Sequence, residues 1–296
     1  MPLKPVPELF AAAYSQGYSL GYFECWNLES LQGIIDAAEQ TRSPIIIGFN
    51  GEFLTDPGRL VPERTAVNGA LGRAVAEASS VPCALIFNEC PIDSAVFQAV
   101  DEGFNLVMLA DPEASYEDYA KRVASLVKYA HAHGAAVEAE IGELPVGSSG
   151  SVVTNHSSMT DPELAADFVK RTGVDLLSVS VGNIHVLLGG SQDLDLDRLE
   201  AIHQRVGIPL GLHGGTSISS ESLQKAVRMG VTKVAYGTYL KQRYLVAMRK
   251  AYGNIDVNPH ELLGKGKEKD IMVAGRLTVR DAVLERIELL GCCGKA

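Results

Sequence analysis

The feature of this sequence that most constrains its fold is an alternation, repeated about eight times, between a strand-length apolar run and a longer stretch with helical spacing. Most of the runs are continuously apolar, which is typical of strands buried on both faces of a parallel sheet. The expected strands are Tyr18 to Cys25, Pro44 to Asn50, Cys83 to Cys90, Leu106 to Asp111, Ala135 to Gly142, Leu176 to Gly182, Pro209 to Gly215 and Lys233 to Tyr239.

The segments between these runs carry helix-start signals. In the stretch from Thr160 to Glu163, a capping residue precedes a proline and an acidic residue. Eight strand and helix units joined by right-handed crossovers close most naturally into an α/β fold of the (β/α)8 type, the TIM barrel. An open doubly wound sheet is the competing fold, but no GxGxxG or Walker sequence follows any run, and this weakens that alternative.

The length of the chain agrees with a single barrel domain. Its 296 residues would make about two average domains, but a barrel uses roughly 200 to 250 residues for one core. We therefore expect one domain over residues 1–296. Residues from about 253 to 296 should form a C-terminal helical extension, which includes the charged run GKGKEK at 264–269 and a closing helix near Thr278 to Leu290. The extension should pack outside the barrel or on a partner subunit.

Charge and cysteine usage narrow the class of function. The chain has 26 Lys and Arg against 36 Asp and Glu, a net charge of −10, so it lacks the overall phosphate attraction on which nucleic-acid binding depends. Its five cysteines form neither a disulfide framework nor a CxxC pattern, which suits a reducing compartment. No secretory leader and no run of roughly 18 apolar residues is visible. We expect a cytoplasmic protein that binds neither nucleic acid nor membrane.

Polar residues at the carboxyl ends of the expected strands are the candidates for chemistry, because barrels build their active sites there. Two histidines would follow adjacent strands at this end, together with several carboxylates. That combination is the ligand chemistry of a divalent metal such as zinc. The polar residues concerned are Glu24, Asn27, Asn88, Glu89, Glu138, Glu140, Asn183, His185 and His213.

Each candidate also has a structural interpretation. One histidine in a barrel loop usually makes a structural hydrogen bond, whereas the pair His185 and His213 favours metal binding. Glu138 and Glu140 alternate with apolar residues and point to one side of their strand, either as functional carboxylates or in a structural ion pair. The other histidines are expected to be structural, except His156, whose role stays open. They are His131, His133, His203 and His260.

Two loops and one glycine-rich turn complete the candidates. The loop from Glu143 to Met159 is long and rich in Gly, Ser and Thr, which favours a mobile lid, and Gly51 to Glu63 follows the second strand in a similar way. Backbone N–H groups after the seventh strand could hold a phosphate together with the end of the eighth. Turns that serve only to reverse the chain are the alternative. The candidate phosphate-binding residues are Gly214, Gly215, Thr216, Gly237 and Thr238.

Four stretches of the sequence resemble the class II, metal-dependent fructose- and tagatose-bisphosphate aldolase family. They are NLESLQGIIDAAEQTRSPIII (27–47), VEAEIGEL (137–144), TDPELAADFVKRTGVDLLSVSVGNIH (160–185) and PLGLHGGTSIS (209–219). They occur in order within a resemblance that runs from about Tyr18 to Leu240. The resemblance implies a dimeric or tetrameric barrel in which zinc polarises the carbonyl of a ketose and stabilises an enediolate.

The resemblance also implies roles for individual residues. His185, in a GxxH motif, and His213, in LHGG, correspond to metal ligands. Glu138 looks like the glutamate of the fifth strand that lies close to the metal. Positions that resemble the phosphate-binding residues of the family are Gly214, Gly215, Thr216 and Thr238.

The sequence departs from the family at the expected active site. Where the family reads HLDHG, this chain reads Ile86 to Cys90, IFNEC, so Glu89 replaces a metal-binding histidine and Asn88 replaces the catalytic aspartate. Glu89 can still bind zinc, whereas Asn88 cannot exchange a proton as a carboxylate does. Further departures are Glu24 for an asparagine, Val186-Leu187-Leu188 after His185 for the GxY of HGxY, and Ala235 for the asparagine of the eighth strand.

Two hypotheses of function follow. The first is a divergent metal-dependent aldolase, or a related lyase, that acts on a sugar-phosphate or keto-acid substrate, with Glu24, Asn88 and Glu140 as catalytic candidates. Glu24 would replace the lost proton-transfer group, and an ion pair of Glu24 with a lysine or arginine is the structural alternative. The second hypothesis is a non-catalytic barrel that binds a ligand as a regulatory subunit. We expect a divalent metal, zinc first among them, a small-molecule substrate, and a homodimer or homotetramer.

Overall fold

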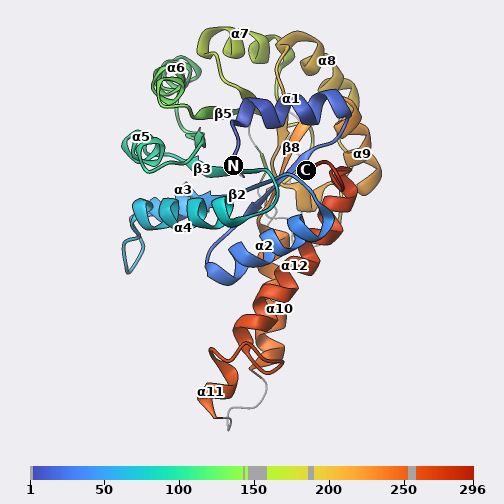
Figure 1. The fold of residues 1–296 in the computed structure, drawn as a ribbon. Helices are drawn as coiled ribbons and strands as arrows, with labels where there is room; N and C mark the ends of the chain where they lie inside the picture. The colour runs from blue at the N-terminus through green and yellow to red at the C-terminus, as the bar shows by residue number, and fades with distance from the viewer. Residues whose placement is uncertain (1–2, 143, 146–158, 186–189, 253–257) are drawn as a thin grey trace.

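A computed structural model describes residues 3–142, 144–145, 159–185, 190–252 and 258–296 of the protein. Within them, eight parallel strands form a closed barrel in chain order from β1 to β8, and helices surround it (Figure 1). This confirms the (β/α)8 barrel expected from the sequence. The strands are β1 Leu20–Glu24, β2 Ile45–Asn50, β3 Cys83–Cys90, β4 Leu106–Leu109, β5 Ala136–Ile141, β6 Leu176–Val179, β7 Leu210–Leu212 and β8 Val231–Tyr236.

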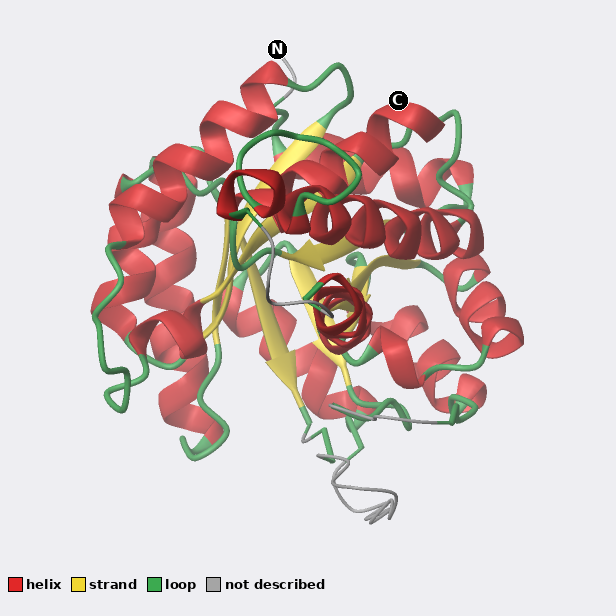
Figure 2. Cartoon of the chain, turned by 90° about the horizontal axis from the view of Figure 1, so that it is seen from below, coloured by secondary structure: helices red, strands yellow, loops and turns green. Residues whose placement is uncertain are grey.

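The helices form the outer layer, as Figure 2 shows with helices in red around the yellow strands. Helix α7 begins at the capping residue that the sequence indicates, because the Asp161 side chain accepts from the N–H groups of Glu163 and Leu164. No helix of the described residues is long and apolar enough to cross a membrane. The helices are α1 Val6–Gln16, α2 Leu28–Thr41, α3 Gly51–Thr55, α4 Thr65–Ala78, α5 Asp93–Asp101, α6 Tyr116–Ala132, α7 Pro162–Thr172, α8 Leu196–Val206, α9 Ser220–Arg228, α10 Thr238–Ala251, α11 Pro259–Leu262 and α12 Ile271–Leu290.

Strand register brings β1 and β8 together where the barrel closes. Tyr22 pairs with Ala235, and Phe23 pairs with Tyr236, whose ring it stacks on at 5.5 Å between centroids. Because side chains alternate along a strand, Tyr22 and Glu24 share the opposite face from Phe23. The Lys233 ammonium lies 4.9 Å from the Tyr22 ring centre, so this opposite face is the interior of the barrel.

Helix α10 and the C-terminal extension together form an arm beside the barrel. Helices α10 and α12 project together from one side, with α11 at the far end (Figure 1). Helix α12 begins at Ile271, earlier than expected from the sequence, because the Asp270 side chain caps it at the Met272 N–H. It packs along α2, where a Cβ on Gly33 would overlap the Arg276 carbonyl.

Three segments differ from the sequence expectations. Strand β8 starts two residues earlier and ends at Tyr236, so Thr238 opens helix α10 instead of lying in a strand. The segment after β2 is not an open loop throughout, because it contains α3, capped by the Asn50 side chain. The expected lid from Glu143 to Met159 lies almost entirely outside the described residues.

Candidate metal centre and active site

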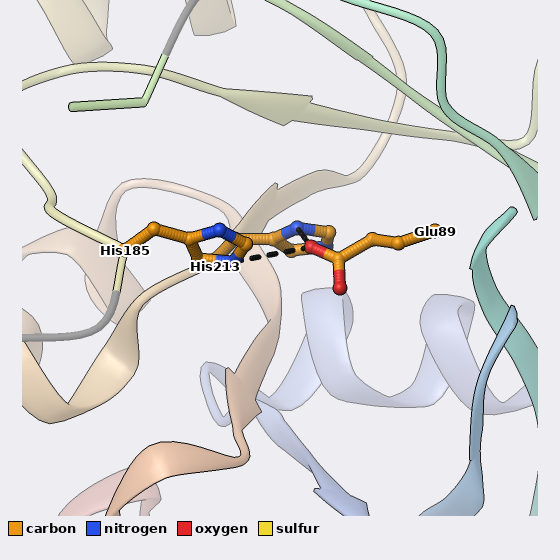
Figure 3. Close-up of side chains that lie close together, drawn as sticks. All are labelled: Glu89, His185 and His213. Atoms are coloured by element: carbon orange, nitrogen blue, oxygen red, sulfur yellow. Dashed lines mark ion pairs between the residues drawn. The ribbon is translucent and has the colours of Figure 1, made fainter. Parts of the chain in front are cut away.

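Three side chains with metal-ligating atoms converge at the carboxyl ends of the strands (Figure 3). One ligand atom from each of Glu89, His185 and His213 lies within 4.8 Å of the other two. Glu89 Oε1 is 2.8 Å from His213 Nδ1 and 3.2 Å from His185 Nε2. The structure therefore brings together the two histidines and the carboxylate that the sequence analysis combined.

The local backbone explains how Glu89 reaches this point. The pairing of β3 with β4 shifts register between Phe87 and Cys90, and Glu89 has a φ of 52°, in the left-handed region. A bulge of this kind re-aims a side chain at the end of a strand. The side-chain amide of Asn50, at the end of β2, donates a hydrogen bond of 2.9 Å to Glu89 Oε2. Its Oε1 remains directed at the histidines.

His213 is fully buried after β7, and its two ring nitrogens have different surroundings. Nε2 is 2.9 Å from Glu138 Oε1 and 3.3 Å from Lys233 Nζ. The shorter distance and the negative charge of Glu138 assign the ring proton to Nε2 as donor. Nδ1 has no hydrogen-bond partner among the described residues, although Glu89 Oε1 and Glu140 Oε2 lie at 2.8 and 3.0 Å. The buried Nδ1 lone pair therefore points at acidic oxygens, an arrangement that a cation completes.

A second buried network lies on the Nε2 side of His213. The Lys233 ammonium, from β8, donates to Glu138 Oε2 at 2.6 Å and to Asn88 Oδ1 at 3.4 Å. Ser178, on β6, donates to Glu138 Oε1 at 2.7 Å. Asn88 is 2% exposed and belongs to this network. Glu138 thus holds His213 at Nε2, whereas Glu140 lies beside Nδ1, the nitrogen that faces Glu89.

Charges in the site shift several pKa values. Burial alone would raise the pKa of Glu138, but Lys233 and His213 outweigh it and lower this pKa to about 2. Burial also acts to raise the pKa of Glu89, and the two histidines hold it well below its usual value. Burial would lower the pKa of His213, yet Glu140 and Glu89 raise it well above the usual range. The acidic oxygens therefore favour a positive charge at His213 Nδ1, carried either by a second ring proton or by a bound cation.

The charge balance of the described cluster fits a divalent ion. With both imidazoles neutral, as they are when they bind a metal, its four carboxylates exceed its two ammonium groups by two negative charges, which one divalent cation would neutralise. Two imidazoles and one carboxylate are also a donor set that zinc accepts. The charged groups are Glu24, Glu89, Glu138 and Glu140 on the negative side, and Lys233 and Lys241 on the positive side.

Glu24 lies at the end of β1 and is 8% exposed. The Lys241 ammonium, from α10, is 2.5 Å from Glu24 Oε1 and 4.5 Å from the ring centre of Phe53. Burial raises the pKa of Glu24, and Lys241 partly offsets this rise. Glu24 is therefore in an ion pair, the structural alternative considered from the sequence.

The other residues expected to bind substrate or phosphate have structural roles in the fold. Asn27 caps α2 by accepting from the Ser30 N–H, and its side-chain amide donates to the Tyr244 hydroxyl. A Cβ on Gly214, which has a φ of 64°, would overlap the Ile184 carbonyl, and one on Gly215 would crowd Val234 and Tyr236. Close packing thus accounts for both glycines without a ligand. Thr216 lies in a short 3₁₀ turn, and Gly237 and Thr238 lead into α10.

Sequence reasoning missed four of the described residues of this site, and one of them, Ser178, is a small polar residue inside an apolar run. Lys233 was detectable, since a lysine interrupts the apolar run VTKVAY. Asn50 was detectable as well, because it is a polar residue at a strand end. Lys241 carries no such signal, since it lies on a helix. The site does not include the other described histidines: His131 contacts Asp175, His203 contacts Tyr14, and His133 and His260 lie at α6 and α11. His156 is outside the described residues.

Comparison with known proteins places the chain among aldolases. Residues 4–295 match the family model described as fructose-bisphosphate aldolase class-II. The fructose-bisphosphate aldolase of Geobacillus stearothermophilus is 30% identical over 299 residues, which cover 100% of this chain and 99% of that protein. The crystal structure of the YdjI aldolase from Escherichia coli K12 has a TM-score of 0.81 at 27% identity, covering 99% of both chains. A putative fructose-1,6-biphosphate aldolase from Coccidioides immitis has a TM-score of 0.82 at 26% identity, covering 98% of this chain and 97% of that one.

Proposed function

Because the chain belongs to the class II fructose-bisphosphate aldolase family, we propose that it is a metal-dependent lyase that breaks or forms a carbon–carbon bond in a sugar-derived or keto-acid substrate. The observation that carries the metal dependence is the buried Nδ1 of His213, which lacks a hydrogen-bond partner in the described chain and faces Glu89 and His185. These three residues would hold the ion, zinc by the chemistry of the donors. A bound ion of this kind polarises a substrate carbonyl.

The residues around the ligands have distinct roles in this proposal. Glu138 accepts the proton of His213 Nε2, which keeps Nδ1 free to bind, and Lys233 holds Glu138 in place. The amide of Asn50 orients Glu89. Each support comes from a different strand, so the ligand geometry is set by the barrel itself.

Proton transfer is assigned to Glu140 first and to Glu24 second. The Glu140 carboxylate lies on the ligand side of His213, with Oε2 at 3.0 Å from Nδ1, and its side chain is 14% exposed. The Lys241 ammonium holds Glu24 Oε1 and acts against proton uptake by this carboxylate. Asn88, in the family position of the catalytic aspartate, supports Lys233 in this proposal and does not transfer a proton.

The family has Asp-His where this chain has Asn88-Glu89. This replacement supports both the proposed metal binding and the proposed change in proton transfer. It moves a carboxylate by one residue along the chain without changing the total charge of the pair. The site therefore keeps its attraction for a cation but loses the carboxylate at position 88. We therefore expect a different residue to transfer the proton. We also expect a substrate other than the usual bisphosphate.

The proposal extends to the setting of the enzyme. It acts on a small molecule in the cytoplasm, without nucleic acid or membrane, as a homodimer or homotetramer. The arm supports self-association, because α10 exposes 53% of Leu245 and 64% of Val246. Sedimentation of the purified chain tests the assembly.

Metal content is the direct test of the ligand set. His213→Ala should lose the bound metal and the chelator-sensitive cleavage of any ketose that the wild type turns over. His131→Ala is the matched control, since His131 pairs with Asp175 on the surface and should keep both properties. Full metal content in His213→Ala would refute the assignment.

The two proton-transfer candidates are separated by amide substitutions. Glu140→Gln should lower turnover, expressed per bound metal ion, by about 10² to 10⁴, because general acid–base groups contribute that much. Glu24→Gln should lower it less. The reverse order would assign the proton to Glu24.

A further inference from the structure

We infer that Glu24 and Lys241 form a built-in ion pair at the start of α10 that excludes a phosphate group, so that the end of the substrate bound there is hydroxylated and uncharged. The inference rests on the proposed function and deepens it by naming the class of substrate. It starts from the place where barrels commonly bind phosphate, the loops after the seventh and eighth strands together with a helix N-terminus.

In this chain that place is the junction of β8 with α10. Strand β8 ends at Tyr236, and Gly237 leads directly into the fourteen residues of α10. No side chain caps the first turn at Gly237. The positive end of the helix dipole and the first N–H groups therefore favour an anion at this point.

The carboxylate of Glu24 already takes up the space in front of Gly237. A Cβ on Gly237 would overlap Glu24 Oε2, so this oxygen lies against the residue that precedes the helix. Lys241, one turn into α10, holds the other oxygen at 2.5 Å. The carboxylate is thus anchored by the same helix whose N-terminus a phosphate would use.

An incoming phosphate would meet repulsion and little compensation. Of the two lysines in the described cluster, Lys233 is engaged by Glu138, and Lys241 is engaged by Glu24 and lies over the Phe53 ring. A dianion in front of Gly237 would stand beside the charge of Glu24. Gly214 and Gly215, on the other side of the junction, are explained by packing. The positive groups that would attract a phosphate here therefore already have partners within the chain.

Hydroxyl groups suit the ion pair better. A carboxylate accepts hydrogen bonds, an ammonium donates them, and a hydroxyl does both. Two neighbouring hydroxyls of a polyol chain can bridge Glu24 and Lys241 without adding charge. The structure thus favours a ketose or keto acid whose bound end carries free hydroxyls.

Binding of inorganic phosphate tests this directly. Glu24→Gln removes the charge and keeps the volume, whereas Glu24→Ser removes both. Glu52→Gln is the matched control, because it changes net charge equally at an exposed position of α3. Titrations at fixed ionic strength and equal metal content should show phosphate binding about tenfold tighter or more in Glu24→Ser than in the wild type. Glu24→Gln should lie between them, and Glu52→Gln should match the wild type.

Any other order of phosphate affinities among these four proteins overturns the inference. Phosphate binding in the wild type as tight as in Glu24→Ser would mean that the ion pair excludes nothing. No gain in either Glu24 variant would mean that no anion position lies behind it. Phosphate held by a bound metal contributes equally in all four proteins, and repeating the titration in the His213→Ala background removes that contribution.

A second measurement compares ketoses with and without a terminal phosphate. The wild type should have the higher kcat/KM on the unphosphorylated member of each pair, and Glu24→Ser should shift the ratio toward the phosphorylated one. The proposed function fails separately, through missing metal or missing cleavage of every ketose. Phosphate binding is read without turnover, so the two failures are distinguishable.

Discussion

Replacing Lys233 by methionine isolates the buried ion pair that supports the candidate metal centre. The substitution keeps a long side chain of similar reach but removes the ammonium that donates to Glu138 at 2.6 Å. Both side chains of the pair are fully buried, with 0% exposure. Glu138 would then be a buried carboxylate opposed only by His213 and Ser178.

The size of the effect follows from that geometry. At 2.6 Å and an effective dielectric constant of about 20, the attraction between the charges is about 6 kcal/mol. Relaxation and partial proton uptake by Glu138 reduce the loss, and removing one partner of a buried pair usually destabilises a protein by about 3 to 5 kcal/mol. That is a large part of a total stability of about 5 to 15 kcal/mol.

Urea denaturation with chelator present measures this loss without a contribution from metal. Lys225→Met is the matched control, since Lys225 pairs with Glu221 at 2.7 Å but is 48% exposed. It should lose about 0.5 kcal/mol or less. The double variant Lys233→Met with Glu138→Leu should recover part of the loss, because no unpaired charge remains. A loss below about 1 kcal/mol in Lys233→Met would refute the reasoning.

Three further outcomes are expected. Cleavage of fructose bisphosphate should be slower than in ordinary enzymes by about 10² to 10⁴, because Asn88 lacks the carboxyl function, and a coupled assay in the usual range of about 1 to 10³ per second would contradict this. Chelation should lower the melting temperature of the wild type but not of His213→Ala, since an ion that binds only the folded state stabilises by about 2.7 kcal/mol at one hundred times its Kd. Gly33→Ala should destabilise by about 1 to 3 kcal/mol despite its better helix propensity, because the added Cβ overlaps the Arg276 carbonyl of α12; unchanged unfolding would show that the two helices separate freely.

Apolar runs in the sequence located all eight strands, because buried parallel strands need continuous apolar residues. Their ends were less certain: Gly237 reads as a strand end, yet it precedes a helix. Strand ends also identified Glu89, His185 and His213, since closing a barrel brings all such ends together. Helix α1 was not foreseen, because it precedes the first strand and no alternation marks it.

Pairings across the barrel could not be read from the sequence. Glu24 and Lys241 are 217 positions apart, and nothing local to either residue indicates the other. The same holds for Lys233 and Asn88, which are 145 positions apart. Residue type at a strand end therefore predicts where chemistry occurs, whereas the partner of each charge depends on strand register and on helix placement.

The packing of α12 on α2 has a consequence for how the protein is made. Arg276 binds Asp36, and the backbone N–H groups of Gly294 and Ala296 donate to carbonyls at the end of α2. About 230 residues separate Thr41 from Ile271. At a synthesis rate of about 5 to 20 residues per second, the ribosome makes α12 roughly 10 to 50 s after it makes α2. The eight strands of the described barrel, and with them the three side chains of the candidate metal centre, are synthesised before this contact forms. All strands of the barrel are therefore present while α2 still lacks the helix that covers it.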